Sequence, residues 1–381
     1  MVNFQKTAPA LIRGTLSIVC VSAIVFLLVD FKEPSNNQEP LFSQKMTASK
    51  QNHSKSILQS GYNEPYLAHK KTKVVASGSY IYWQPSQQNF FVGETINSDI
   101  ITSKNVVRRT KDFKFKYQSG FKVGLGAIFP EDNWTLYGEY VRLHSNIHSH
   151  VQVNGPSFAQ SSWTPLLQPD NPTFSEITNY WNFQFDLFDL NLLRAFYVGK
   201  SLVFSPFITG RGVLIHQRLK ATSFYTATQG PVSTESNFKQ HSLQIGPRIG
   251  TDLYWLLGKG FKFSGKIGGA LLYNRNHTKS KSPYLVHSDT PYVVNDTFSS
   301  TQGSFCPNLD MGVGFGWENK KNIGFSLNYD ILTFFNQNNL GNNHVLNQIG
   351  NSLDVYETPY GFQSQNNLTM HGLTVTAQIA F

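Results

Sequence analysis

Charged residues stand at alternate positions in several segments whose intervening positions are apolar. If the apolar positions face lipid, the charged positions must meet water or a charged partner, because burying an unpaired charge is prohibitively costly. Such groups could form a solute-selecting constriction in a pore, or they could pair across a narrow lumen and fill it. The candidate pore-lining residues are Lys114, Lys116, Lys122, Glu139, Asp186, Arg211, Arg248, Asp252, Lys262, Lys266, Asp310 and Asp330.

Histidines are the other candidates for chemistry. His144, His216 and His371 fall near the expected rim of the strands, but no motif ties an acid or a serine to them, so exposed rim histidines explain them better than a catalytic pair. His144, His148 and His150 could offer metal ligands on a loop, yet no cysteine or carboxylate stands at matching spacing. We therefore expect no enzymatic activity, no bound metal and no cofactor.

The composition narrows the class of protein. Only 14% of the 381 residues are charged, against about 25% in a typical soluble domain, while aromatic residues also reach 14% and the mean hydropathy is −0.28. A disordered chain would be aromatic-poor, and a polytopic helical membrane protein would carry several uncharged runs of about 18 residues or more. The net charge of +9 comes without any nucleic-acid recognition motif, so nucleic acid is not an expected partner.

Alternation with a period of two dominates the chain from about residue 74. Apolar residues from Phe113 to Phe129 share one parity, and Lys and Gly residues fill the other; a strand separates two such sets cleanly, whereas a helix mixes them. The same pattern predicts ten strands, with an uncertainty of two because 88–95 could add another. The strands are expected near 74–84, 111–129, 134–146, 179–193, 201–218, 241–257, 261–274, 308–318, 322–334 and 367–381.

The connections between these strands alternate in length. Short turns are expected at 130–133, 196–200, 258–260 and 318–321, and long polar connections near 84–110, 147–178, 219–240, 275–306 and 335–366. Short periplasmic turns with long outer loops are typical of bacterial outer-membrane barrels. The predicted fold is therefore all-β: a transmembrane antiparallel up-and-down β-barrel of about ten strands (8–12), with both chain ends on the periplasmic side.

Individual positions refine this prediction. In 179–193, Trp181 to Leu187 alternate with polar residues and then lose phase at Phe188–Asp189, which predicts a bulge or an exit from the membrane. Arg142 lies eight residues from Trp134, or about 20 Å along the membrane normal. Arg142 is thus expected at the outer interface, where it could bind lipopolysaccharide phosphate or simply extend into water. Trp134, Trp255, Phe261 and Trp317 lie beside short turns, as a periplasmic aromatic girdle would.

The N-terminal part of the chain reads as an export segment and a linker. Lys6 and Arg13 precede an uncharged run at 14–29, so residues 1–30 are expected to be a signal peptide or a hydrophobic anchor. Residues 31–72 are polar and aperiodic, as in a flexible linker, and 73–381 form the expected barrel. If the signal is removed, Cys306 is the single cysteine left, either a free thiol or a partner for another chain.

The chain resembles the pore-forming major outer-membrane protein family of the Legionella and Chlamydia-relative type over about residues 72–381. The resemblance lies in the order of several segments: Tyr82-Trp83, the hairpin 121–145, 181–190 (WNFQFDLFDL), Pro206-Phe207 with Gly210-Arg211-Gly212, Gly246-Pro247-Arg248 and 334–337 (FFNQ). The final amphipathic strand ends on Phe381, which looks like the assembly signal read by the barrel assembly machinery.

We therefore expect a porin of the bacterial outer membrane that allows passive diffusion of small hydrophilic solutes, with pore formation resting largely on the resemblance. The alternative is a narrow, closed barrel that acts through its outer loops in adhesion or envelope structure. A soluble exported β protein is a third hypothesis. The expected partners are outer-membrane lipid and lipopolysaccharide, the barrel assembly machinery and further copies of the same chain.

Overall fold

The computed structural model describes residues 72–97, 107–130, 133–153, 158–163, 174–199, 201–227, 230–286, 292–320, 322–338, 340 and 366–381. The expected export segment and linker lie outside these residues. Within these ranges, no helix is long and apolar enough to cross a membrane.

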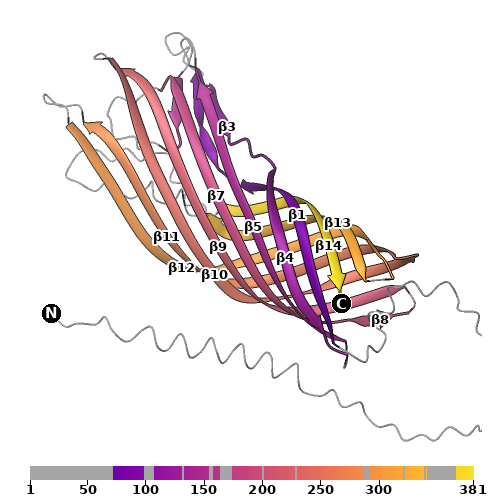
Figure 1. The fold of residues 1–381 in the computed structure, drawn as a ribbon. Helices are drawn as coiled ribbons and strands as arrows, with labels where there is room; N and C mark the ends of the chain where they lie inside the picture. Colours follow the sequence, from indigo (N-terminus) through magenta and orange to yellow (C-terminus); the bar gives the residue numbers. More distant parts are fainter. Residues whose placement is uncertain are drawn as a thin grey trace, which may run out of the picture. The chain divides into compact units, whose positions relative to one another are not determined.

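Ten antiparallel strands form a closed barrel (Figure 1). In spatial order they are β10 (Gly230–Gly258), β11 (Phe261–Val286), β12 (Tyr292–Glu318), β13 (Ile323–Asn338), β14 (Asn366–Ala380), β1 (Lys73–Gln87), β4 (Gln118–Ile128), β5 (Trp134–Gln152), β7 (Glu176–Arg194) and β9 (Leu202–Ala227). Pairing of β9 with β10 closes the ring. The predicted fold class and its ten strands are confirmed.

The first and last barrel strands seal the wall against each other. β1 pairs with β14 from Val75 opposite Ala380 to Gln87 opposite Leu368. Beyond that ladder, the Val74 amide donates to the Phe381 carbonyl at 2.8 Å, and the Phe381 amide donates back at 2.9 Å. A closed wall leaves no edge with unpaired backbone groups, as the membrane interior requires. The short β8 (Phe196–Val198) pairs with β9 beside a turn.

The short turns have the backbone that tight hairpins require. Gly258, Lys259 and Gly260 all have positive φ, at 94°, 52° and 85°, and Asn133 and Asn322 have φ of 56° and 59°. Glycine adopts this region freely and asparagine tolerates it better than most residues. Residues 258–260 therefore form a tight turn, as predicted, whereas residues 196–198 of the turn predicted at 196–200 form β8 instead.

Two of the expected long loops are strands instead. β9 and β10 stay in register from Trp255 opposite Leu202 to Gly230 opposite Ala227, and β11 and β12 do so from Phe261 opposite Trp317 to Val286 opposite Tyr292. The prediction of loops at 219–240 and 275–306 was wrong for this reason. Beyond the membrane the outer side of a strand meets water, so the apolar alternation fades although the hydrogen-bond ladder continues.

A second sheet lies at the outer end. β2 (Phe91–Asn97) pairs with β3 (Val107–Asp112) on one side and β6 (Phe158–Ser161) on the other. This sheet arises within the expected connections 84–110 and 147–178. Its neighbours Phe90, Phe113 and Trp163 are buried together with Trp181 of β7 and Phe238 of β10, and Phe90 lies 5.5 Å from Trp181 between ring centroids.

The apolar parity faces outward on most strands, as predicted for a lipid-facing wall. Ile249 of β10, Val313 and Phe315 of β12, and Leu125 of β4 are 56–65% exposed. β7 is the exception, because its inward side is the aromatic one: Trp181, Phe183 and Phe185 are at most 1% exposed, while Phe188 is 49% exposed. The pairing of β5 with β7 runs without a register shift, so of the two interpretations of Phe188–Asp189 the bulge was wrong, and the exit from the membrane stays a prediction.

Candidate functional site: the barrel interior

The inward side chains form layers along the barrel axis. From the short-turn end outward, β9 presents Thr209 and Arg211, then Val213 and Ile215, and then Gln217, all of them buried. In this order, the layers are a periplasmic cavity, an ionic layer, an apolar plug and an amide layer.

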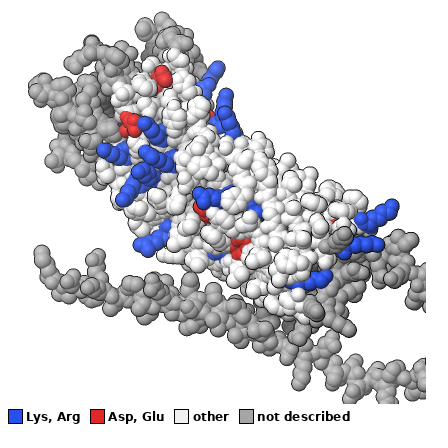
Figure 2. All heavy atoms as spheres, in the orientation of Figure 1, with Lys and Arg blue, Asp and Glu red and all other residues white. Residues whose placement is uncertain are grey.

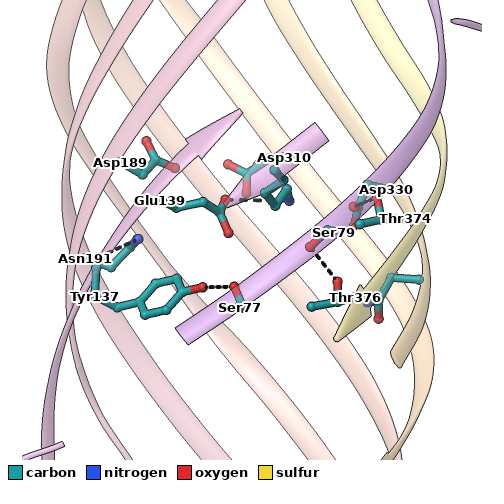
Figure 3. A network of polar contacts seen from close by, with 12 residues as sticks. Ser77, Ser79, Tyr137, Glu139, Asp189, Asn191, Asp310, Asp330, Thr374 and Thr376 are labelled. Carbon is teal, nitrogen blue, oxygen red and sulfur yellow. Dashed lines mark hydrogen bonds and ion pairs between the residues drawn. The ribbon is translucent and has the colours of Figure 1, made fainter. Parts of the chain in front are cut away.

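The periplasmic cavity has a volume of about 290 Å³ and is lined by residues from all ten barrel strands. Figure 3 shows polar groups that extend into it from different strands. Lys122 Nζ lies 3.6 Å from Glu139 Oε1, the Tyr137 hydroxyl lies 2.5 Å from Ser77 Oγ, and Thr374 Oγ1 donates to Asp330 at 2.6 Å. A polar cavity of this size can hold several water molecules.

The ionic layer, Asp189, Arg211, Arg248 and Asp310, lies between the cavity and the plug. Arg211 donates to both oxygens of Asp189, from Nε at 2.8 Å and from Nη2 at 2.6 Å. It also reaches Asp310 Oδ1 at 3.4 Å and donates to Asn308 Oδ1. Both side chains of the Arg211–Asp189 pair are only 3% exposed. Two parallel N–H···O contacts of this kind fix orientation as well as charge.

The second arginine completes the layer. Arg248 donates from Nε to Asp310 Oδ1 at 2.8 Å and from Nη2 to Oδ2 of the same carboxylate. Its Nη1 donates to Thr209 Oγ1 at 3.2 Å, and its guanidinium stacks 4.1 Å from the ring centroid of Phe207. Asp310 thus contacts both arginines. The charges of the two arginines and the two aspartates cancel, so the layer as a whole is neutral within the lumen.

The apolar plug fills the next layer. Its members are Ile81, Trp83, Val141, Leu143, Phe183, Phe185, Leu187, Val213, Ile215, Leu272, Cys306, Leu332, Phe334, Leu368 and Met370, none more than 5% exposed. The rings of Phe185 on β7 and Phe334 on β13 meet edge to face with centroids 5.8 Å apart. These two strands are five places apart in a ring of ten, so the contact spans the lumen from one wall to the opposite wall.

The amide layer lies outside the plug. Gln217 Oε1 accepts from Gln87 and from the Trp181 indole, the latter at 3.1 Å, and Gln217 Nε2 donates to Gln337 Oε1 at 3.4 Å. These contacts again connect strands on different sides of the barrel. The side-chain amides of Gln244 and Asn274 are fully buried and have no hydrogen-bond partner among the described residues.

Most of the predicted pore-lining residues do lie inside. The interior ones are Lys122, Glu139, Arg211, Arg248, Asp252, Lys262, Lys266, Asp310 and Asp330, of which Asp310 pairs directly with both arginines. Their role in a pore stays a prediction. Sequence reasoning missed Asp189, because the wrong facing of β7 placed it on the lipid side, and Glu318, which lies 3.4 Å from Lys262 Nζ.

Three of the predicted interior positions were wrong. Lys114 and Lys116 are exposed in the link between β3 and β4, where Phe113 turns inward instead. Asp186 faces outward on β7, where it accepts from the Tyr140 hydroxyl at 2.5 Å and lies 3.9 Å from Arg142 Nε. Arg142 is 54% exposed on the outward side of β5, and the Asp186 carboxylate already neutralises it; its place at the outer interface stays a prediction.

The rim histidines form no catalytic cluster in the described structure. His144 contacts Asn146 and Asn182, His371 contacts the Tyr329 hydroxyl, and His216 packs against His241. Among the described residues no group of three His, Cys, Asp or Glu could hold a metal ion.

The remaining predicted residues are placed at the surface and in the plug. The Cys306 thiol is buried and lies 3.1 Å from the Phe335 carbonyl, so it is inaccessible to another chain in this conformation. The ring of Phe381 is 70% exposed. Its use as an assembly signal stays a prediction.

A closed antiparallel barrel with an apolar outer wall, and with ionic and amide layers enclosed in its lumen, defines an outer-membrane β-barrel protein of the bacterial envelope. The family described as the Legionella pneumophila major outer membrane protein precursor matches residues 67–381. The chain belongs to this family, as its sequence predicted, and its location is the bacterial outer membrane.

Several solved barrels are also similar at low identity. The outer membrane protease OmpT of Escherichia coli is 9% identical, with 81% of this chain and 96% of that chain covered and a TM-score of 0.41. Ail, the attachment invasion locus protein of Yersinia pestis, is 9% identical over 82% and 99%, with a TM-score of 0.24. The toluene transporter TodX of Pseudomonas putida is 6% identical over 86% and 93%, with a TM-score of 0.26. These values carry no functional inference. No curated protein matches the sequence.

Proposed function

We propose that the chain is a closed outer-membrane barrel that acts through its outer end, in envelope structure or adhesion. The observation that carries this proposal is the contact of Phe185 with Phe334 across the lumen, within a plug of fully buried side chains. Barrels of eight strands enclose just enough room for side chains, whereas aqueous channels occur at about 16–18 strands. Ten strands stand near the filled end of this range.

Conductance tests the proposal. The full chain, refolded and shown to be a heat-modifiable barrel by gel mobility, is incorporated into planar bilayers. The expected result is a membrane without defined conductance steps, and liposomes that carry the chain should not swell in sugar solutions. Discrete, reproducible steps from a chain shown to be folded would overturn the closed barrel.

The second candidate is the porin expected from the sequence, which would pass small hydrophilic solutes by passive diffusion. It is supported by the periplasmic cavity, which brings Lys122, Asp252 and Lys266 of three strands around space for water, and by the resemblance to a pore-forming family. On this hypothesis the apolar plug would act as a gate, because an apolar constriction excludes water and ions until it widens. The same bilayer recording separates the candidates.

We propose no catalytic role for either candidate. The contacts of His144 and His371 with amide and phenol groups support this, since neither histidine is paired there with both an acid and a nucleophile. Incubation of the folded chain with peptide and phospholipid substrates should give no turnover; hydrolysis that is lost in a His371→Ala variant would contradict it.

A further inference from the structure

The outer surface of β9, β10 and β11 carries an arrangement of cations that the barrel itself does not explain. Cross-strand pairing sets the outward side chains in rows. The first row beyond the apolar wall is His216–His241–His277, and the next is Arg218–Lys239–Lys279. We call the residues of these two rows, together with Arg275, the basic face. Figure 2 shows Lys and Arg gathered on the outer part of the barrel wall, with few acids between them.

The cation row is unfavourable for the isolated barrel. Lys239 stands directly opposite Arg218 on one side and Lys279 on the other, and like charges directly opposite each other destabilise a sheet. Within the described part of the chain, Glu235 is the nearby acid, and its Oε2 lies 2.8 Å from Lys220 Nζ. No described acid forms an ion pair with the row. Among the described residues the row therefore has no anionic partner in direct contact, which leaves it open to an external anion.

The basic face also has a groove of suitable composition at its membrane side. Leu214 and Leu243 contribute its apolar part, and His216, His241, Arg275 and His277 its polar part, with Ser242 and Thr301. The groove measures about 440 Å³, within the range of about 300–1,000 Å³ common for ligand sites. A ligand with an apolar portion toward the membrane and anionic groups above it matches this order.

Position along the barrel identifies the source of the anions. Leu243, Tyr273 and Phe305 end the apolar outer wall of β10, β11 and β12, so the two rows lie at the headgroup level of the outer leaflet. Tyr329 of β13 and His371 of β14, which bond to each other, lie nearer the short-turn end, since Tyr329 pairs with Val313 of β12 and Val313 pairs with Gly265 of β11. Arg142 of β5 is neutralised by Asp186. Unlike Arg142, the cations Arg218, Lys239 and Lys279 form no ion pair with any described acid.

We propose that the basic face binds the phosphate groups of a lipopolysaccharide molecule, with Arg218, Lys239 and Lys279 holding phosphate and the groove holding the adjoining sugar. Arginine and lysine are the usual partners of phosphate oxygens, and basic clusters at the membrane surface gain from each added cation near anionic headgroups. The site requires only the outer-membrane location of the barrel. It is independent of whether the lumen is open or closed.

The test compares two triple variants of the full chain. Arg218→Gln/Lys239→Gln/Lys279→Gln removes the cation row, and Lys111→Gln/Lys114→Gln/Lys116→Gln removes the same charge from exposed positions at the end of β3 and in the link that follows it. Both are checked for heat-modifiable mobility, and binding of lipopolysaccharide, dephosphorylated lipopolysaccharide and phosphatidylglycerol is measured in detergent at fixed salt. The first variant should bind lipopolysaccharide roughly 100-fold more weakly than the wild type, at about fivefold per lost cation, and the second should bind like the wild type.

Each other result counts against the site. Equal weakening of binding by both variants would show a general attraction to net charge. If dephosphorylated lipopolysaccharide bound as tightly as lipopolysaccharide itself, the face would not recognise phosphate. Phosphatidylglycerol binding as tight as that of lipopolysaccharide would assign the face to anionic lipid in general. If the cation-row variant does not fold, Lys239→Gln is compared with Lys114→Gln. Lys239→Gln should bind lipopolysaccharide about fivefold more weakly than the wild type, and Lys114→Gln should bind it like the wild type.

Discussion

Asp310 is the residue on which the ionic layer depends, because both arginines donate to its carboxylate. A buried pair contributes little net stability compared with apolar replacements of both partners, but removal of one partner leaves an uncompensated buried charge. The layer therefore makes the lumen intolerant of single changes. The pair of Arg142 with Asp186, which is half exposed on the outer wall, offers the matched surface comparison.

Arg248→Met should lower the free energy of unfolding by about 3–5 kcal/mol, because Asp310 then loses its bidentate partner. Arg248→Met/Asp310→Leu should be less destabilised than this single variant. Arg142→Met should change stability by about 1 kcal/mol or less. Urea titration of the lipid-refolded barrel, followed by gel mobility, measures all three, and similar losses for Arg248→Met and Arg142→Met would contradict the buried layer.

His241 should make the outer hairpins sensitive to acid. Burial lowers the pKa of His241, and His216, His277, Lys239 and Lys279 lower it further. The unfolded chain then binds more protons than the folded chain, so stability present above about pH 6.5 is lost as the pH falls through the lowered pKa of the folded state. Diagonal neighbours Arg218 and Arg275 add to the repulsion.

The prediction is that the unfolding midpoint of the lipid-refolded barrel decreases from pH 7.5 to pH 5, and that His241→Gln reduces this decrease. Glutamine keeps the size and polarity of the side chain but does not titrate. His148→Gln, on the outer surface of β5, is the control and should retain the wild-type dependence. An unchanged pH dependence in His241→Gln would contradict the assignment.

At the scale of elements, β7 shows what the sequence could and could not predict. Alternation identified the ten barrel strands, because in a strand of the wall every second residue faces lipid and the residues between them face the interior. It assigned the wrong side to Trp181–Leu187, because alternation does not say which side is lipid when the interior is itself apolar. The continuous pairing of β7 with β5 and β9 decides the facing.

The interior partners were also beyond sequence reasoning. Arg211 pairs with Asp189 on β7 and Asp310 on β12, and only the closed ring brings these strands together. The alternation predicted that Arg211 and Arg248 face inward. It could not predict which carboxylates they pair with, because that depends on register and strand order. The three-stranded outer sheet was missed because its short strands carry no sustained period.

The facing of β7 can be measured with single cysteines. In a Cys20→Ser/Cys306→Ser background, which removes both native cysteines, Phe188→Cys should label with a fluorophore in liposomes and be quenched by lipid-soluble quenchers, because its side chain is 49% exposed on the wall. Phe185→Cys, three residues away and fully buried, should resist labelling until the barrel is unfolded. Reversal of the two results would restore the original prediction for β7.

The end of β14 makes a separate prediction about assembly. Phe381→Ser keeps the backbone bonds to Val74 and removes a ring that is 70% exposed. It should therefore lower the yield of heat-modifiable barrel in cells while leaving refolding of the purified chain in detergent unchanged. Leu257→Ser, which is also exposed on the periplasmic part of the wall, is the control; equal loss of cellular yield would argue for a general effect of surface polarity.

At the scale of the whole molecule, the lumen has two seals in series. The ionic layer spans β7, β9, β10 and β12, and the apolar plug outside it joins opposite walls through Phe185 and Phe334. The two seals depend on different interactions, ion pairs in the first and apolar contacts in the second. A single opening in one seal should therefore leave the other in place.

Phe185→Ala separates the two seals. Loss of a buried phenylalanine should cost about 3–5 kcal/mol of unfolding free energy, yet the folded variant should remain silent in planar bilayers, because Arg211 and Arg248 still fill the lumen beneath the cavity created. Phe188→Ala, which removes the same ring from the lipid-facing wall, should lose much less stability and also remain silent. Conductance steps in Phe185→Ala, absent from the wild type and from Phe188→Ala, would show that the plug alone closes the barrel and that ions pass the ionic layer, and would favour a gated pore over a closed barrel.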